Sequence, residues 1–443
     1  MDPLSLAEAV RDAVYGAVDS VEVLVERADQ AGYMSENGPW IPTLEGDLWR
    51  VALRGLKGGR LAVASSSVPD PGLCAAALLR ALPCAQPSPL GAFEAVRPVD
   101  DDRRGEDPSV SALVDRPSAL RALAEALRAR TLEARGGLAV SALETSVGAW
   151  RRERVVLTEA GAARSRASGL YAGVQINGDW GEDRAWTAMP LEESVTALGA
   201  RYVASLPARE VTPEAFLGGA REVPVELSPR LLEALLRRLW TERLGLDRAL
   251  AGHPVFAVGE RAADEGVTLV DDPGARGSFK GAPTDDEGVQ TGARAVLSEG
   301  VVRALLSDRR SAAEAGTVST GNGFRVPFIS EDRADAPVRV ALGHLSMTPG
   351  ATPREALVRG RALRVPALLG LHSANRATGA FNSPIIGGLA LEDGRPVARL
   401  QPGAWSLQGN AFGLLRGLLG RSSEREHTGS AELPWVVAPL RAG

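Results

Sequence analysis

Hydrophobic residues near the amino terminus recur with a helical period. Leu6, Val10 and Val14 stand four residues apart, and Ser5 followed by Glu8 matches a capping box. This pattern predicts a first helix that begins at about Ser5.

A second helical pattern lies further along the chain. Ser118 is placed to cap a helix in which Leu120, Leu123 and Leu127 share one face. We expect this helix to pack on the first one. The proline- and charge-rich stretch between residues 81 and 109 has no period, and it predicts a surface loop.

Alternating hydrophobic and polar residues predict strands in the rest of the first half. Residues 21–25 alternate, and the β-rich runs 48–53 and 60–65 are joined by Lys57-Gly58-Gly59, a hairpin signal. Residues 137–189 contain strand-like segments interrupted by glycines and by a turn signal at 177–179. These patterns indicate an antiparallel sheet.

The second half opens with a helix and continues as short strands. Ser228-Pro229 is a helix start, and Leu231 to Trp240 carry an apolar stripe that predicts burial. Short β-like runs follow to the carboxy terminus. The fold class expected is α+β with two domains. Residues 1–218 form helices on an antiparallel sheet, and residues 219–443 form a mainly antiparallel β domain.

Composition narrows the class of protein. The chain has 443 residues, 44% of them hydrophobic, which excludes a disordered or fibrous architecture. The net charge of −5 provides no positive field for nucleic acid or an anionic membrane, so neither is expected as a partner. No apolar run is long enough to span a membrane, and Cys74 and Cys84 are the only cysteines. We expect a cytoplasmic protein.

Local motifs for a metal site or for hydrolysis are missing. The four histidines, at positions 253, 344, 372 and 427, show no metal-ligand spacing, and no nucleophile motif accompanies them. We therefore expect no metal and no catalytic residue in this chain.

Two acidic turns are the first candidates for a site. Residues 271–274 and 283–288 contain five carboxylates, including Asp285, Asp286 and Glu287, which precede Gly288. Such acids accept hydrogen bonds from backbone in turns, and this structural role is favoured. The alternative is a substrate-facing loop that holds a cation or transfers protons.

A glycine-flanked asparagine is the second candidate. Gly321-Asn322-Gly323 is not a phosphate loop, because no Lys-Ser/Thr pair follows it. The bare backbone indicates a close approach, and three neighbours remain open: a partner chain, a peptide or a tight turn of the chain itself.

The order of several segments resembles the TldD/PmbA family. These are SPRLLEALLRRLW, TLVDDPGARGSFKGAPTDDEGVQTGARAVLSEG, VSTGNG, ATGAFNSPIIGGLALEDG and LQGN, which cover most of residues 222–412. The TGxF strand adds Phe381 to the substrate or interface candidates. The resemblance implies a paired system, in which a TldD-type subunit carries an HExxxH zinc motif and a late cysteine ligand, and a PmbA (TldE)-type subunit lacks them.

The positions of that motif are degenerate here. The corresponding helix has Leu232, Glu233 and Arg237 in place of the His-Glu and the second His, and no cysteine follows Cys84. Leucine has no lone pair and arginine stays protonated, so neither binds zinc. The chain therefore resembles the PmbA (TldE) side.

This resemblance implies a function for the chain. It would be a non-catalytic, chamber-forming subunit that pairs with a TldD-like HExxxH homologue, with zinc in that partner and no cofactor of its own. Its substrates would be extended, unfolded or precursor (leader) peptides, in natural-product maturation or in general turnover. Two alternatives stay open: a self-sufficient peptidase with a site made of Asp285, Asp286 and Glu287 or a histidine, and a regulatory peptide-binding protein without proteolysis.

Overall fold

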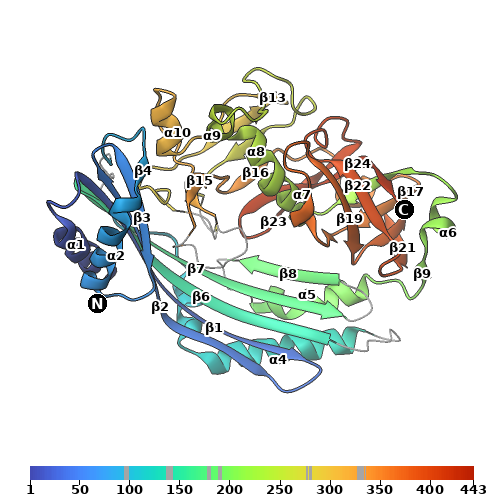
Figure 1. The fold of residues 1–443 in the computed structure, drawn as a ribbon. Coiled ribbons are helices and arrows are strands. Elements are labelled where there is room, and N and C mark those ends of the chain that lie inside the picture. Colours follow the sequence, from blue (N-terminus) through green and yellow to red (C-terminus); the bar gives the residue numbers. More distant parts are fainter. Residues whose placement is uncertain are drawn as a thin grey trace.

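A long curved sheet forms the amino-terminal half of the computed structural model (Figure 1). The structure describes residues 1–93, 99–135, 143–176, 181–187, 192–275, 278, 282–326, 334 and 336–443. Within these residues the strand order is β4-β3-β2-β1-β6-β7-β5, and β8 also pairs with β7. The strands are β1 Ser20–Glu36, β2 Ile41–Lys57, β3 Arg60–Ser66, β4 Gln86–Pro87, β5 Val99–Gly105, β6 Leu143–Thr158, β7 Gly161–Ile176 and β8 Gly181–Thr187.

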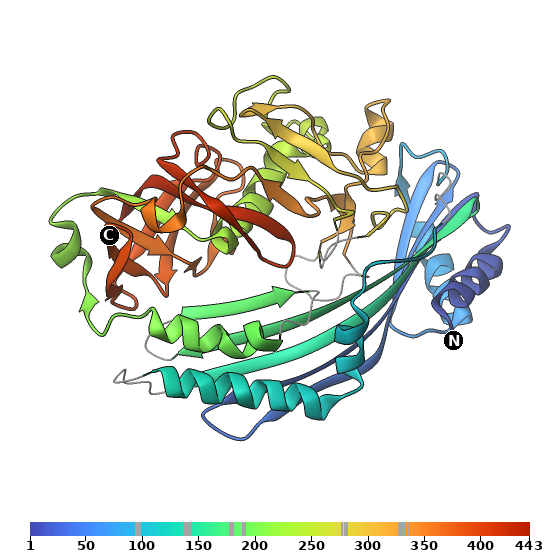
Figure 2. The same cartoon turned by 180° about the vertical axis from the view of Figure 1, so that it is seen from behind.

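Helices cover the convex face of this sheet at both ends (Figures 1 and 2). At one end α1 Pro3–Val14 and α2 Pro71–Ala81 pack on Val23, Val51 and Val155. At the other end α4 Pro117–Ala134 and α5 Glu192–Ala204 share a second core with β6 and β7, beside the short α3 Pro108–Val114. Every second residue of a strand points to the same face, so alternating apolar residues of these strands face the helices.

The carboxy-terminal half builds a second, mixed sheet with one large core. In the described chain the order is β13-β12-β11-β16-β24-β10-β17-β20-β21-β9, and β22 and β23 also pair with β24. Its strands are β9 Glu210–Val211, β10 Glu222–Leu227, β11 Leu269–Asp271, β12 Arg294–Ser298, β13 Val301–Val302, β16 Leu345–Met347, β17 Arg361–Val365, β18 Ala367–Leu368, β19 Ala380–Ile386, β20 Leu389–Glu392, β21 Arg395–Leu400, β22 Ser406–Asn410, β23 Gly420–His427 and β24 Ala431–Ala442.

Smaller elements complete this carboxy-terminal lobe. The strands β14 Gly323–Arg325 and β15 Val338–Val340 form a separate pair. Short helices are α6 Pro213–Leu217, α7 Pro229–Leu235, α8 Thr241–Leu244, α9 Leu246–Leu250 and α10 Arg309–Glu314. A π-helical turn, Leu236–Trp240, joins α7 to α8.

The carboxy-terminal lobe lies over the concave face of the first sheet (Figure 2). Part of that contact is apolar, since Ala334 packs with Leu24, Ala52 and Val156 of the sheet. The α+β class and the mainly β second half are thereby confirmed. The domain boundary expected at 218/219 stays a prediction, although β9 already pairs with β21 of the second sheet. No helix among the described residues is both long and apolar enough to cross a membrane.

Several local expectations were confirmed. Gly58 and Gly59 have φ of 58° and 70°, as a tight hairpin between β2 and β3 requires. Ser228 caps α7, because its side chain accepts a hydrogen bond from the Leu231 amide. The stripe from Leu231 to Trp240 is buried in the large core.

Other expectations were wrong. Asp2, not Ser5, caps α1, because its carboxylate accepts from the amides of Leu4 and Ser5. The α4 helix packs on α5 instead of α1. Residues 99–105 form β5, which pairs in parallel with β7, so backbone pairing overrides a strand-poor composition. The turn signal at 177–179 lies outside the described residues.

Candidate functional site

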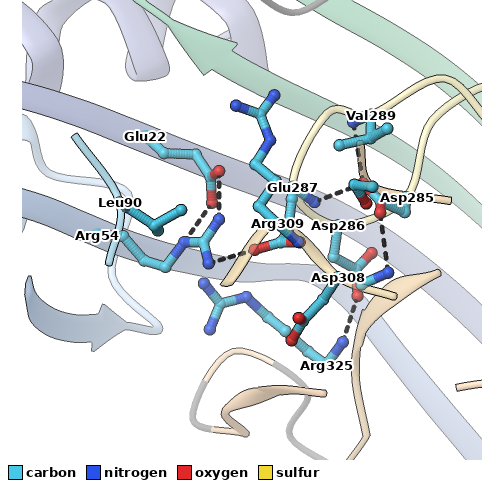
Figure 3. A network of polar contacts seen from close by, with 12 residues as sticks. Glu22, Arg54, Leu90, Asp285, Asp286, Glu287, Val289, Asp308, Arg309 and Arg325 are labelled. Carbon is cyan, nitrogen blue, oxygen red and sulfur yellow. Dashed lines mark hydrogen bonds and ion pairs between the residues drawn. The ribbon is translucent and has the colours of Figure 1, made fainter. Parts of the chain in front are cut away.

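The acidic turn at residues 285–287 is buried between the two lobes (Figure 3). Asp285 accepts from the amides of Glu287 (3.0 Å), Val289 (2.9 Å) and Gly323 (2.8 Å). This confirms the expected role of the acids as acceptors of backbone donors. Gly288 follows with φ of 74°, a conformation that favours glycine.

Two arginines of the curved sheet reach this turn. Arg54 on β2 binds both carboxylate oxygens of Glu22, at 2.7 and 2.5 Å, and donates its remaining Nη1 to Glu287 at 2.5 Å. Arg154 on β6 donates to Asp286 and to the carbonyl of Thr284. Both arginines are only 4% exposed, so these ion pairs join the lobes in a buried interface.

Amides of the carboxy-terminal lobe bind the other carboxylate oxygens. Glu287 accepts from the Arg309 amide at 2.7 Å, and Asp286 accepts from the Arg325 amide at 2.7 Å. Burial and the nearby charge of Glu287 raise the pKa of Asp285 well above its ordinary value. The three carboxylates are therefore enclosed and bonded, and this geometry gives no support to an open acid–base or cation site.

The Gly321-Asn322-Gly323 turn belongs to the same buried cluster. Asn322 donates its side-chain amide to Asp271 at 2.6 Å and to the carbonyl of Ala341 at 3.1 Å. A Cβ at Gly321 would lie 2.6 Å from the Gln290 carbonyl oxygen, and one at Gly323 would overlap Glu287. The segment that approaches this turn is thus part of the same chain. The sequence left open whether a partner chain, a peptide or the chain itself approaches this turn, and in the structure the close neighbours are Gln290 and Glu287 of the chain itself.

Leu232 and Glu233 lie on the buried helix α7, and Arg237 lies on the π-helical turn that continues it. Leu232 is fully buried in the apolar core. Arg237 donates Nε to Glu233 at 2.5 Å and Nη1 to the Leu342 carbonyl at 2.7 Å. Its Nη2 donates to the carbonyls of Gly343 and Ser430. The guanidinium therefore ties the helix to two distant segments.

Glu233 accepts two further hydrogen bonds, from the hydroxyls of Thr428 and Ser430. Burial alone would raise the pKa of Glu233, but Arg237 and these hydroxyls hold it below its ordinary value. A leucine core residue and a protonated guanidinium offer no lone pair, so these positions do not fit a zinc ion. Within the described chain, no three His, Cys, Asp or Glu side chains group so as to hold a metal ion.

Two histidines lie beside this pair and were not singled out from the sequence. The rings of His344 and His427 are 5.6 Å apart. His344 is 5% exposed, and its Nδ1 has no hydrogen-bond partner among the described residues. No local spacing could have indicated this, because His344 lies in a loop and His427 is the last residue of β23, far from it in the chain.

His344 is expected to make the stability of the protein depend on pH. Burial, His427 and Arg237 lower the pKa of His344 to about 4. The unfolded state, with its histidine pKa near 6.5, therefore binds more protons between pH 4 and 6.5, and stability rises with pH in this window. Asp271, whose pKa burial raises to about 6, acts in the opposite direction from pH 4 to 6.

The variant His344→Gln should remove on the order of 2 kcal/mol of this gain in unfolding free energy. Urea denaturation at pH 4.5 and 7 measures it, and His372→Gln, at an exposed position, is the control. An unchanged pH profile in His344→Gln would contradict the assignment.

Phe381 lies away from the other predicted candidates. It is on β19 and contributes to a cleft of ≈ 520 Å³ in the carboxy-terminal lobe. The structure thus brings the acidic turn and the glycine-flanked turn together. Asn322 contacts Asp271, Asp271 accepts from the Gly343 amide, and the Gly343 carbonyl accepts from Arg237 of the π-helical turn after α7. Phe381 lies at a separate place.

Comparisons with known proteins agree with this architecture. Residues 220–439 match the PmbA/TldA metallopeptidase C-terminal domain. A metalloprotease from Archaeoglobus fulgidus is 31% identical over 130 residues, 24% of this chain and 30% of the relative. A metalloprotease from Methanocaldococcus jannaschii is 31% identical over 101 residues, 22% of each chain. The chain therefore matches less than a third of the length of these curated relatives.

Solved structures match the whole fold. TldE from Thermococcus kodakarensis has a TM-score of 0.76 at 18% identity, with 99% of both chains covered. A protein from Thermotoga maritima described as a candidate modulator of a DNA gyrase has the same TM-score and identity, with 99% of this chain and 100% of that chain covered. From the match of its carboxy-terminal half, together with these relatives and this fold, the chain belongs to the TldD/PmbA family.

Proposed function

We propose that this chain is the non-catalytic, chamber-forming subunit of a TldD/TldE-type zinc metallopeptidase that acts on unfolded or precursor peptides. One observation carries the proposal: Leu232 and Arg237 stand where the resemblance places two histidine ligands, and Arg237 donates hydrogen bonds to Glu233 and three carbonyls. A position filled in this way has no capacity for zinc. The zinc and the catalytic chemistry then belong to a TldD-like partner in the cytoplasm.

The curved sheet supports the second part of the proposal. Its concave face is turned toward the carboxy-terminal lobe (Figure 1), and in this proposal that face forms one wall of the chamber. Extended peptides are recognised by strand addition and by side chains along such surfaces. The alternative of a self-sufficient peptidase would need an accessible acid, whereas Asp285, Asp286 and Glu287 are enclosed.

Co-expression with an HExxxH-bearing homologue tests this function. We expect a stable mixed complex that contains about one zinc per pair and digests unfolded casein, with neither property in the isolated chain. Size-exclusion chromatography with light scattering, elemental analysis and peptide digestion measure the three quantities. The control is the same complex whose partner carries HExxxH→AExxxA. Digestion by the isolated chain would favour the self-sufficient peptidase, and peptide binding without any active complex would favour the regulatory protein.

A further inference from the structure

The cleft beside Phe381 forms where two strands of the second sheet separate. β22 pairs with β24 through Leu407↔Ala442 and Gln408↔Arg441. The pairing of β24 with β23 begins only at Val437. Ala438, Pro439 and Leu440 lie between these two pairings and line the cleft. The sheet is therefore open over three residues, next to strands that carry two of the family-like segments, TGAFNS and LQGN.

A row of polar side chains crosses four neighbouring strands at this opening. Asn382 is paired with Gln408, Gln408 with Arg441, and Arg441 with Glu222. Residues directly opposite in adjacent strands point to the same face. All four side chains are exposed, and all four line the cleft.

Three groups of this row are available to a ligand. Within the described part of the chain, the carboxamides of Asn382 and Gln408 make no hydrogen bond, and Arg441 makes no ion pair, even with Glu222. The neighbouring Asn410 differs, because its side chain accepts from the amides of Phe412 and Gly413 and donates to Thr378. Asn410 therefore shapes the loop, whereas the row keeps free donors and acceptors.

Apolar side chains form the inner surface of the cleft. Phe381, Leu414 and Leu440 contribute to it and are 4%, 4% and 8% exposed. Gly409 makes room for them, since a Cβ there would lie 2.7 Å from the Phe381 ring and 2.9 Å from Leu440. Phe381 and Leu440 alternate along their strands with Asn382 and Arg441, so the cleft has a buried apolar side and an exposed polar row. Ligand sites combine apolar surface with a few polar groups in this way.

From this arrangement we infer that the cleft binds the carboxy-terminal end of an extended peptide. The two carboxamides present both a donor and an acceptor, as a peptide group requires. The Arg441 guanidinium binds a terminal carboxylate in bidentate geometry, and the apolar surface takes the last side chain. Glu222, opposite Arg441, disfavours an acidic final side chain, and the apolar side of the cleft favours an apolar one. The inference rests on the proposed function for the source of such ends, namely peptides cut by the complex.

Binding by the isolated full-length chain tests the inference. The probe is a short fluorescein-labelled peptide that ends in leucine, prepared with a free carboxylate and as its amide, and the readout is fluorescence anisotropy. We expect the free acid to bind about tenfold more tightly than the amide, as the loss of one charge-assisted contact implies. Arg441→Gln should reduce the affinity for the acid to that for the amide, and should leave the affinity for the amide unchanged.

Two further variants make the test specific. Asn382→Ala combined with Gln408→Ala should weaken both peptides by about three- to tenfold, because each loses backbone contacts. Arg395→Gln, at an exposed arginine on β21, is the matched control and should change neither affinity. The inference would be overturned if the acid and the amide bound equally, if neither bound, or if Arg441→Gln left the affinity for the acid unchanged. None of these outcomes depends on whether the mixed complex forms, so failure of the proposed function would be seen separately.

Discussion

Replacing Arg237 with leucine is expected to lower the free energy of unfolding by about 3–5 kcal/mol, the usual loss when one partner of a buried ion pair is removed. Glu233 would keep its charge in a buried position without Arg237, and the carbonyls of Leu342, Gly343 and Ser430 would lose their donor. Urea denaturation followed by tryptophan fluorescence measures the loss at pH 7.

The loss in Arg237→Leu should exceed that of a neighbouring control variant and should depend on pH. Arg238→Leu changes the adjacent, partly exposed arginine of the same helix and should cost less than about 1 kcal/mol. Arg237 lowers the pKa of Glu233 in the folded state. The stabilisation that Arg237 gives is therefore complete above the pKa of Glu233 in the unfolded state, and it is lost as the pH falls through the pKa of Glu233 in the folded state. The gap between the two variants should therefore narrow near pH 4. Equal losses in Arg237→Leu and Arg238→Leu would contradict this role.

Elements with a strong local signal could be predicted from the sequence. The cap at Ser228 and the apolar stripe through Leu235 and Trp240 lie in one continuous helical segment. The helical period of the sequence is therefore enough to locate this buried helix. The Gly58-Gly59 hairpin is likewise local, because two residues with positive φ fix the turn. Such features need no knowledge of the rest of the fold.

Elements stabilised by distant neighbours could not be predicted. The β5 strand contains three aspartates in a row and is a strand because its backbone pairs with β7, about 60 residues later in the chain. The Ser5–Glu8 capping box was outcompeted by Asp2, whose carboxylate binds two amides of the first turn. In both cases geometry outside the local motif decided the outcome.

The candidate site shows the same division. The sequence indicates that the acids at 285–287 accept backbone donors, and the structure agrees. Their arginine partners are 233 residues away for Arg54 and Glu287, and 132 for Arg154 and Asp286, so no spacing rule could connect them. The glycine-flanked turn was informative about close approach, but not about which segment approaches. Identifying that segment required the packing of the two lobes.

Replacing Arg54 with methionine is the second change with a large expected effect, again about 3–5 kcal/mol of unfolding free energy. Arg54 neutralises Glu22 within the sheet and Glu287 across the lobe interface. Burial alone would lower the pKa of Arg54, but these two carboxylates raise it, which reflects how strongly the cation is held. Its removal leaves Glu22 and Glu287 buried without their ion-pair partner, although the buried Arg325 still attracts both carboxylates.

A comparison of three further variants separates the two contacts of Arg54. Glu287→Gln weakens the bond between the lobes, so limited proteolysis at the lobe interface should become faster, whereas Glu22→Gln should affect mainly global stability. Arg27→Met is the control, because Arg27 pairs with Asp47 at an exposed position and should cost less than about 1 kcal/mol. High salt should abolish the Arg27 effect and spare that of Arg54, since buried pairs are screened little. A loss in Arg54→Met that disappears in 1 M NaCl, or that matches Arg27→Met, would show that this ion pair does not hold the lobes together.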